Sequence, residues 1–181
     1  MNRRKLKVEE LNRISIEEFK DSNKIPLVVV LDNIRSLNNI GSVFRTCDAF
    51  RLEEIILCGI TATPPNVEIH KTALGAENSM NWRYFDETIS AIYDLKDKGY
   101  EVYSIEQTEN SIPLESFSIV PTDKYAIVFG HEVHGVSQDV IDASNGSIEI
   151  PQFGTKHSLN ISVSAGIVIW DIFKQYLANM V

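Results

Sequence analysis

The sequence predicts one α/β domain in which a mainly parallel sheet is flanked by helices. Short aliphatic runs that fit buried strands alternate with segments whose apolar residues recur at helical spacing, and this alternation is typical of a parallel sheet. The 181 residues are enough for a domain with a substantial core. A chain of this size typically buries ~70% of its unfolded surface. The apolar content of 44% is that of an ordinary globular protein.

The first third of the chain predicts a weak helix, a buried strand and an amphipathic helix. Val8–Lys20 carries few apolar residues at helical spacing, so any helix there is weakly amphipathic. Leu27–Leu31 is a continuous run of leucine and valine, as in a parallel strand that is buried on both faces. Apolar residues then recur at helical spacing over Ile40–Cys47.

The middle third predicts two strands and two helices. Ile55–Cys58 is a second apolar strand, and two prolines place residues 61–67 in a loop. His70–Glu77 predicts a short helix. Asp86–Lys98 predicts a longer amphipathic helix, which a glycine ends. Val102–Ile105 follows as a third strand.

The last third predicts two more strands, a short helix and a long final helix. Thr108–Asp123 holds two prolines and is expected to be mostly irregular. The strands are Tyr125–Phe129 and Ser147–Ile150, with a helix at Ser137–Ala143 between them. Ser158–Met180 is apolar on most sides in its first half, so a second surface must cover it and a homodimer is expected.

The charge is distributed unevenly along the chain. The net charge is −8, but the residues before Val8 carry four cations and no acids, which leaves 13 cations and 25 acids for the rest. A basic arm on an acidic body can bind RNA if the arm and a few arginines form a local patch. A frayed N-terminus is the simpler reading, and charge alone does not decide between the two.

The cysteine content and the N-terminus favour a reduced, cytoplasmic protein. The two cysteines, Cys47 and Cys58, do not make a disulfide framework. The first residues are basic with no apolar stretch behind them, so no signal peptide is expected. The longest apolar stretch is interrupted by serines and an aspartate, which makes it too polar and too short to cross a membrane.

The first strand runs into the segment that is richest in polar and flexible residues. Asn38 and Asn39 stand where a helix would be capped. Gly41 and Arg45 lie one turn apart on one helix face, and the missing side chain of Gly41 predicts room for a substrate beside Arg45. The plain alternative is a surface Arg45 paired with Asp48, with the asparagines acting only as caps.

The run FGHEVHG, from Phe129 to Gly135, invites a zinc hypothesis. A metalloprotease-type helix needs histidines four residues apart with a glutamate between them. Here His131 and His134 are three apart in a loop at a strand end, and no third ligand follows at recognisable spacing. We therefore expect no metal. The ordinary alternative is that Glu132 accepts hydrogen bonds from backbone amides.

A third polar segment follows the last strand. Ile150 and Pro151 leave the sheet, Gly154 follows, and Ser158–Asn160 precede the final helix. Small and polar residues here can line a pocket with backbone amides and carbonyls. The alternative is a helix start capped by Ser158. The nucleotide-binding patterns GxGxxG and GxxxxGK[ST] and the hydrolase pattern GxSxG do not occur.

Together and in this order, the three segments resemble the three motifs of the SPOUT superfamily, in particular its SpoU/TrmH branch of RNA ribose 2′-O-methyltransferases. The matching residues are Asn39, Gly41 and Arg45 in the first motif, Phe129, Gly130, Glu132 and Gly135 in the second, and Ile150, Pro151, Ser158, Leu159 and Asn160 in the third. The resemblance covers nearly the whole chain. It predicts a short basic arm over residues 1–26 and a methyltransferase domain over residues 27–181.

The resemblance implies a C-terminal trefoil knot, a homodimer and S-adenosylmethionine as the cofactor. The implied cofactor-binding residues are Ile105, Gly130, Ile150, Ser158 and Leu159. The implied catalytic residues are Arg45, Asn39, Glu132 and Asn160. Because a guanidinium loses its proton only with great difficulty, we expect the arginine to clamp the RNA phosphate and stabilise the developing oxyanion rather than act as a literal base.

The RNA-binding residues are expected on the arm and around the first motif. The candidates are Arg3, Arg4, Lys5 and Lys7, with Arg35, Arg51, Lys71 and Arg83 in addition. The substrate implied is tRNA or rRNA, with tRNA slightly favoured. Two alternatives stay open: an RNA-binding protein of the same fold without turnover, and a metalloenzyme built on His131, Glu132 and His134.

Overall fold

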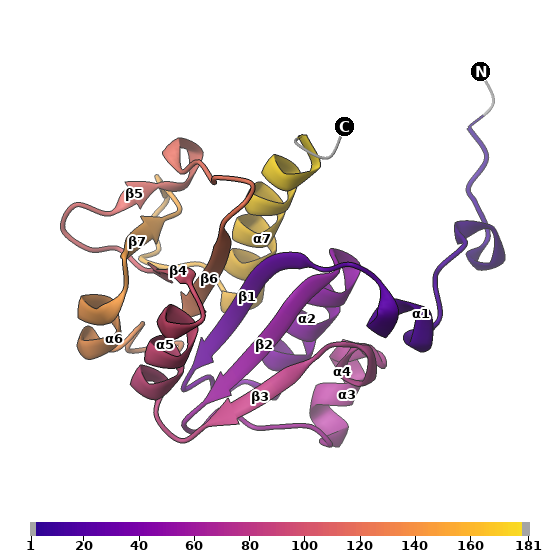
Figure 1. Cartoon of the computed structure of the whole chain (residues 1–181), viewed down its shortest axis with the longest axis horizontal. Coiled ribbons are helices and arrows are strands. Elements are labelled where there is room, and N and C mark those ends of the chain that lie inside the picture. Colours follow the sequence, from indigo (N-terminus) through magenta and orange to yellow (C-terminus); the bar gives the residue numbers. More distant parts are fainter. Residues whose placement is uncertain (1–2, 179–181) are drawn as a thin grey trace.

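The computed structural model of the chain describes residues 3–178. Within them, seven strands form one sheet in the order β3-β2-β1-β6-β4-β7-β5, and every neighbouring pair is parallel (Figure 1). In chain order the strands are β1 (Ile25–Asp32), β2 (Leu52–Cys58), β3 (Trp82–Phe85), β4 (Tyr100–Ile105), β5 (Ile112–Pro113), β6 (Lys124–Phe129) and β7 (Gly146–Glu149). The expected parallel α/β architecture is therefore confirmed.

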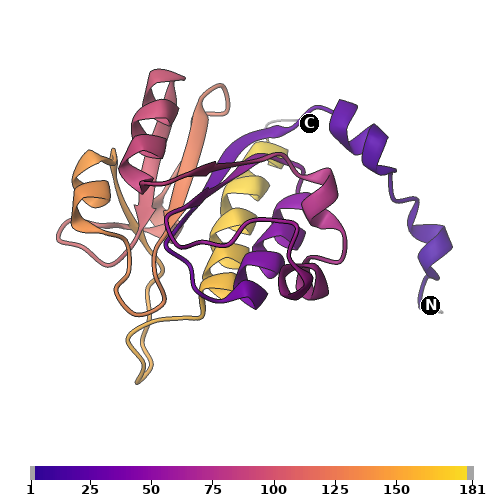
Figure 2. The same cartoon turned by 90° about the horizontal axis from the view of Figure 1, so that it is seen from below.

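Helices cover both faces of this sheet. They are α1 (Ile16–Asp21), α2 (Leu37–Ala49), α3 (Val67–Ala73), α4 (Ala76–Ser79), α5 (Thr88–Asp97), α6 (Gln138–Ala143) and α7 (Ile161–Ala178), with 3-10 turns η1 (Val8–Leu11) and η2 (Leu114–Ser116). In Figure 2, α5 and α6 lie on one side of the strands, and α2, α3 and α7 lie on the other. Within residues 3–178, no helix has the length and apolar character needed to cross a membrane.

The aliphatic sequence of the central strand β1 is explained by its burial on both faces. Leu27, Val29 and Leu31 contribute to the core under α2 and α7, whereas Val28 and Val30 contribute to the core under α5 and α6. A strand that is covered on both faces needs apolar residues at every position, which explains the unbroken aliphatic run. Because all strands are parallel, the loops after β1, β4, β6 and β7 emerge at the same edge of the sheet.

The structure adds two strands that the sequence pattern did not predict. β3 is a short edge strand paired only with β2 among the described strands, and its residues are half-buried or exposed. It contains Arg83, whose guanidinium bonds Glu54 at 2.7 Å and Asp94 at 2.7 Å. A strand stabilised in this way lacks the aliphatic signal of the inner strands. β5 has only two residues, in the segment expected to be irregular.

The helix expected over Val8–Lys20 is divided into two shorter elements. Ser15 caps α1, because its hydroxyl accepts a hydrogen bond from the Glu18 amide at 3.1 Å and the Glu18 carboxylate accepts one from the Ser15 amide at 2.7 Å. This capping box sets the helix start after Ser15. Upstream of it, Asn12 has a φ of 47° and ends η1. Both views show this N-terminal arm extending away from the sheet (Figures 1 and 2).

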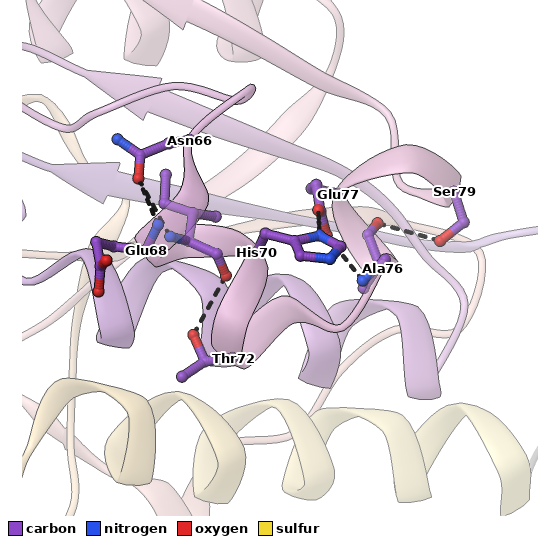
Figure 3. Close-up of polar contacts among 9 residues, drawn as sticks. Asn66, Glu68, His70, Thr72, Ala76, Glu77 and Ser79 are labelled. Carbon is purple, nitrogen blue, oxygen red and sulfur yellow. Dashed lines mark hydrogen bonds and ion pairs between the residues drawn. The ribbon is translucent and has the colours of Figure 1, made fainter.

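The single helix expected over His70–Glu77 is also divided, as Figure 3 shows. α3 begins earlier, because Asn66 Oδ1 accepts hydrogen bonds from the amides of Glu68 at 2.9 Å and Ile69 at 3.3 Å. Leu74 and Gly75 then take φ values of 53° and 96°, which ends α3 before α4 starts. Across this break, Glu77 bonds His70 Nδ1 at 2.5 Å and accepts the Gly75 amide at 3.0 Å.

The final helix begins at Ile161 rather than at Ser158. Asn160 caps it, since its Oδ1 accepts the Ser162 amide at 2.9 Å. The reading of Ser158 as the cap is therefore wrong, and residues 150–160 form a loop instead. The last expected helical positions, 179 and 180, lie outside the described residues. Cys47 and Cys58 are both buried and free.

Candidate active site

A cavity of about 1220 Å3 opens at the carboxyl ends of β4, β6 and β7. Its walls include residues 105–110 and 129–136, where β4 and β6 run into the loops that follow them. Strand β7 with the residue after it, over 146–150, and residues 157–161 at the start of α7 also line it. Loops at the carboxyl edge of a parallel sheet are where open α/β folds place their ligands. The topology therefore produces this cavity from segments far apart in the sequence.

The five residues expected to bind the cofactor all line this one cavity: Ile105, Gly130, Ile150, Ser158 and Leu159. Ile105 ends β4, and Gly130 directly follows β6. The other three belong to the loop between β7 and α7. The structure thus brings the second and third sequence motifs together with the end of β4.

Gly130 is required where the hairpin after β6 closes. The amides and carbonyls of His131 and Gly135 bond each other at 3.0 and 2.8 Å, which makes a tight five-residue loop. A Cβ at Gly130 would lie 2.1 Å from both the Gly135 carbonyl carbon and the Val136 nitrogen. Only glycine allows the two ends of the loop to approach this closely.

Glu132, at the tip of this hairpin, binds the N-terminal end of α2. Its carboxylate accepts hydrogen bonds from the amides of Arg35 at 3.1 Å and Ser36 at 2.9 Å, and from Asn39 Nδ2 at 3.4 Å. Desolvation on burial acts to raise the pKa of Glu132, but these donors more than offset it and hold the pKa below its ordinary value. The carboxylate therefore stays ionised and serves as an acceptor; it does not pair with Arg45.

Asn39 joins this contact to the third motif. Its Oδ1 accepts a hydrogen bond from Asn160 Nδ2 at 3.2 Å, across 121 positions of sequence. Asn160 also caps α7. Glu132, Asn39 and Asn160 thus form one hydrogen-bonded chain that links all three sequence motifs beside the cavity. The expectation that Asn38 and Asn39 cap α2 is wrong, since Ser36 does so through its hydroxyl at 3.3 Å from the Asn39 amide.

Arg45 lies apart from its own chain's cavity. It is exposed on α2 and is not among the cavity-lining residues. A rotation of about 100° per residue places it on a different side of the helix from Asn39. Within residues 3–178 its guanidinium makes no hydrogen bond or ion pair. The alternative pairing with Asp48 is not found, since Asp48 accepts the Ser79 hydroxyl at 2.5 Å.

Gly41 does not leave room for a substrate, contrary to the sequence-based expectation. A Cβ there would lie 2.2 Å from Thr72 Oγ1 and 2.3 Å from the Ile69 carbonyl oxygen, so α3 already occupies the space. Thr72 further ties α3 to α2 by donating to the Asn38 carbonyl at 3.0 Å. The glycine serves close packing of α2 against α3, which a single sequence does not reveal.

The expected RNA-binding cations have different surroundings. Arg3, Lys5, Lys7, Arg35 and Arg51 are exposed. Arg4 pairs with Glu10 at 2.7 Å, and Lys71 pairs with Glu68 at 2.7 Å, both on the surface. Arg83 is different, because its two carboxylate partners hold it to the sheet edge and raise its pKa. These ion pairs stabilise the edge of the sheet, and the place of Arg83 among the RNA-binding candidates stays a prediction.

Asp32, which ends β1, has a role at the site that the sequence pattern did not predict. Its side chain is buried and accepts hydrogen bonds from the Thr88 hydroxyl at 2.5 Å and Asn33 Nδ2 at 2.8 Å, and from the Ser137 amide at 3.3 Å. It thereby fixes the far end of the loop that carries Glu132. A charged residue directly after a buried strand was the available signal, but its partner lies 105 positions away.

No metal-binding cluster of three or more His, Cys, Asp or Glu side chains is found in the described part of the chain. His131 and His134 do lie together, with ring centroids 4.7 Å apart. However, His131 Nδ1 accepts the Val133 and His134 amides at 3.0 and 3.3 Å, so this ring nitrogen already supports the hairpin.

The fold and the site define a parallel α/β protein with a ligand cavity built from three linked motifs. The family profile for the SpoU rRNA Methylase family matches residues 26–170. The chain therefore belongs to this family.

Individual relatives of the chain carry the names of RNA 2′-O-methyltransferases. The chain is 29% identical over 168 residues to a tRNA (guanosine(18)-2′-O)-methyltransferase of Thermus thermophilus, covering 93% of this chain and 84% of the relative. It is 29% identical over 150 residues to the 23S rRNA (guanosine-2′-O-)-methyltransferase RlmB of Nitrosomonas europaea, covering 83% of this chain and 56% of that protein.

Solved structures confirm the fold. A tRNA-modifying TrmH/SpoU enzyme of A. aeolicus superposes with a TM-score of 0.80 at 20% identity, covering 91% of this chain and 84% of that chain. An AdoMet-bound rRNA methyltransferase of Sinorhizobium meliloti gives a TM-score of 0.77 at 23% identity, covering 88% of this chain and 60% of that chain.

Proposed function

We propose that the protein is an RNA methyltransferase that transfers a methyl group from S-adenosylmethionine to a ribose 2′-hydroxyl of tRNA or rRNA. The observation that carries the proposal is the hydrogen-bonded chain of Glu132, Asn39 and Asn160, which joins three motifs at one cavity. Family membership supports the reaction class. The tRNA-directed relative is covered over most of its length, and this slightly favours tRNA as the substrate.

The residues around the cavity fit a cationic cofactor. Within the described chain, the cavity lining holds no lysine or arginine but does hold the acids Glu106, Glu109, Glu132, Asp142 and Glu149. S-adenosylmethionine carries a sulfonium and an ammonium group, so negative charge around it is favourable. Ile105, Gly130, Ile150, Ser158 and Leu159 would hold it. When bound, the cofactor supplies the electrophilic methyl group.

The protein's own part in the reaction is to position the ribose and to stabilise developing charge. We assign Asn160 and Asn39 to orienting the ribose, and Glu132 to holding the first two motifs in register. The guanidinium of Arg45 stabilises the negative charge that develops on the ribose oxygen, with the RNA phosphate held beside it. Loss of such a contact typically costs on the order of 10²-fold or more in turnover.

Because Arg45 lies outside the cavity of its own chain, we propose that it serves the cavity of a partner subunit in a homodimer. The surface of α7 supports a dimer: Val163, Ile167, Trp170 and Leu177 are 39–50% exposed along one side of the helix. A row of large apolar residues on a helix is typical of a surface that another protein covers.

We also propose that RNA approaches through the N-terminal arm and the first motif rather than through the acidic cavity mouth. Arg3, Arg4, Lys5 and Lys7 precede a body that is rich in carboxylates, and Arg35 is exposed where Glu132 meets α2. Lys71 and Arg51 extend this set. Phosphate contacts of this kind supply most of the affinity for RNA and weaken with salt. The division into an arm over residues 1–26 and a domain over residues 27–181 follows from this proposal.

The C-terminal trefoil knot belongs to the same proposal. The path of the chain supports it, because β7 lies between β4 and β5 whereas the following α7 returns to contact α2. On the way, the 150–160 loop meets the segment after β4, where Gln107 Nε2 donates to the His157 carbonyl at 3.0 Å. The expected cytoplasmic location stays a prediction.

The proposal is tested by methyl transfer from labelled S-adenosylmethionine to unmodified tRNA and rRNA. We expect label in RNA with the wild type. Arg45→Ala should bind the cofactor normally but lower turnover by ~10²-fold or more. Lys98→Ala, which removes an exposed cation at the end of α5, is the matched control and should retain wild-type turnover. An RNA-binding protein without turnover would retain RNA and leave it unlabelled.

A further inference from the structure

Glu106 directly follows β4 and lines the cavity next to Ile105, one of the proposed cofactor-binding residues. Its own amide donates to the Ile148 carbonyl at 3.1 Å, which ties it to β7. Its carboxylate accepts the Gln107 amide on Oε1 at 2.9 Å and the Val136 amide on Oε2 at 3.1 Å. The side chain is therefore held in a defined position by the floor of the cavity.

Two glycines make room for this carboxylate. Gly135 has a φ of +70°, and a Cβ there would lie 2.1 Å from Glu106 Oε2. The Gly135–Val136 peptide in turn lies directly against Gly130, where a Cβ would also meet it at 2.1 Å. Glu106 thus contacts the backbone that shapes the cavity wall, and no side chain at Gly135 can come between them.

The carboxylate has unused capacity as an acceptor. An ionised carboxylate can accept about four hydrogen bonds. Two protein donors are found for Glu106 within the described residues, and no lysine or arginine lines the cavity beside it. The remaining lone pairs are available to a ligand that presents several donors. Among the groups of S-adenosylmethionine, the two ribose hydroxyls form such a pair.

We propose that Glu106 binds the ribose hydroxyls of the cofactor. The inference rests on the proposed function, because it assumes that the cavity takes an adenosyl sulfonium compound. Glu106 stands at the carboxyl end of a parallel strand beside the ligand crevice, the place from which acidic side chains bind ribose hydroxyls in other nucleotide-binding α/β folds. Its contact with Val136 presets the carboxylate before the ligand arrives.

The test is calorimetric binding of S-adenosylhomocysteine, of its 2′-deoxy and 3′-deoxy analogues and of an analogue that lacks the ammonium group, without RNA. The wild type should bind the parent compound ~10-fold more tightly than at least one deoxy analogue, because a hydrogen bond to a charged group is worth about that factor. Glu106→Ala should lose a similar factor for the parent and show no preference between parent and analogue. Glu115→Gln, an equal charge change on an exposed residue outside the cavity, should bind as the wild type does.

Glu106→Gln separates binding from folding, since the amide keeps one acceptor oxygen and nearly the same shape. It should fold as the wild type does and show a reduced preference for the parent compound. The inference is overturned if either variant keeps the full wild-type preference, or if only an analogue lacking the ammonium loses affinity in a Glu106-dependent way. A wild type that binds none of these compounds would instead overturn the proposed function, and the inference with it.

Discussion

At the scale of single residues, carboxylates at strand ends organise the loops of the site. Asp32 ends β1 and reaches Ser137, Glu106 follows β4 and reaches Val136, and Glu132 follows β6 and reaches the start of α2. Each acid accepts a backbone amide from a segment other than its own, and both Asp32 and Glu106 bind the end of the loop after β6. Such hydrogen bonds to charged groups are each worth about 1.5–3 kcal/mol, so these few contacts can fix the relative positions of the loops.

Replacement of Glu132 tests this account. Glu132→Ala leaves the Arg35 and Ser36 amides without their acceptor and should lower the free energy of unfolding by about 1–3 kcal/mol. Glu132→Gln keeps one acceptor oxygen and should lose less. Urea denaturation at neutral pH measures both values, with Glu115→Gln as the control. An Ala variant as stable as the wild type would show that the contact does not stabilise α2.

The same residue predicts a pH dependence. The pKa of Glu132 is below its ordinary value in the folded protein. Its contribution to stability is therefore complete above the unfolded pKa and is lost as the pH falls through the folded pKa. In Glu132→Gln this part of the acid destabilisation should disappear, so the stability difference from the wild type should shrink as the pH is lowered. A difference that is constant with pH would contradict the assignment.

At the scale of elements, α2 connects the site to the rest of the molecule. Its first turn contacts Glu132 and Asn160, its middle packs on α3, and its apolar face lies on the core. The apolar spacing predicted this helix and its buried face from the sequence. Its start at Leu37 and the role of Gly41 were missed, because they depend on Ser36 as the cap and on a neighbouring helix about thirty residues away.

The packing of α2 on α3 gives a paired prediction. Gly41→Ala forces a methyl group against Thr72 and the Ile69 carbonyl, and should destabilise the protein by about 1–3 kcal/mol. Gly154→Ala, in the loop before α7, meets no atom within 4 Å, and Gly154 does not have a positive φ. It should be neutral or slightly stabilising, by up to about 1 kcal/mol, because alanine restricts the unfolded chain more than glycine does. Thermal unfolding of both variants checks this, and equal melting temperatures would contradict the close contact at Gly41.

At the scale of the whole molecule, the sequence predicts inner strands better than it predicts edges and loops. The run from Leu27 to Leu31 is apolar because both of its faces are covered, so burial itself produces the signal. β3 has half-exposed residues and is tied to the sheet by Arg83, so it leaves no such signal. The motifs indicated which loops form the cavity, but Asp32 and Glu106 act on partners 105 and 30 positions away.

Complementation between two inactive variants tests the proposed dimer. Arg45→Ala removes the guanidinium, and Gly130→Ala deforms the cavity wall. If Arg45 serves the partner subunit, a mixed dimer has one intact site, and a random mixture should recover about a quarter of wild-type activity. If Arg45 serves its own chain, each site in a mixed dimer carries a lesion and no activity returns. Methyl transfer after joint refolding measures the outcome.

The position of the transferred methyl group tests the central claim most directly. RNA labelled by the wild-type protein is hydrolysed in alkali, which needs a free 2′-hydroxyl and leaves a 2′-O-methylated nucleotide joined to its neighbour. The account predicts that the label is found in an alkali-resistant dinucleotide and that Arg45→Ala reduces its amount. Label in mononucleotides, or RNA that takes up no label, would contradict it.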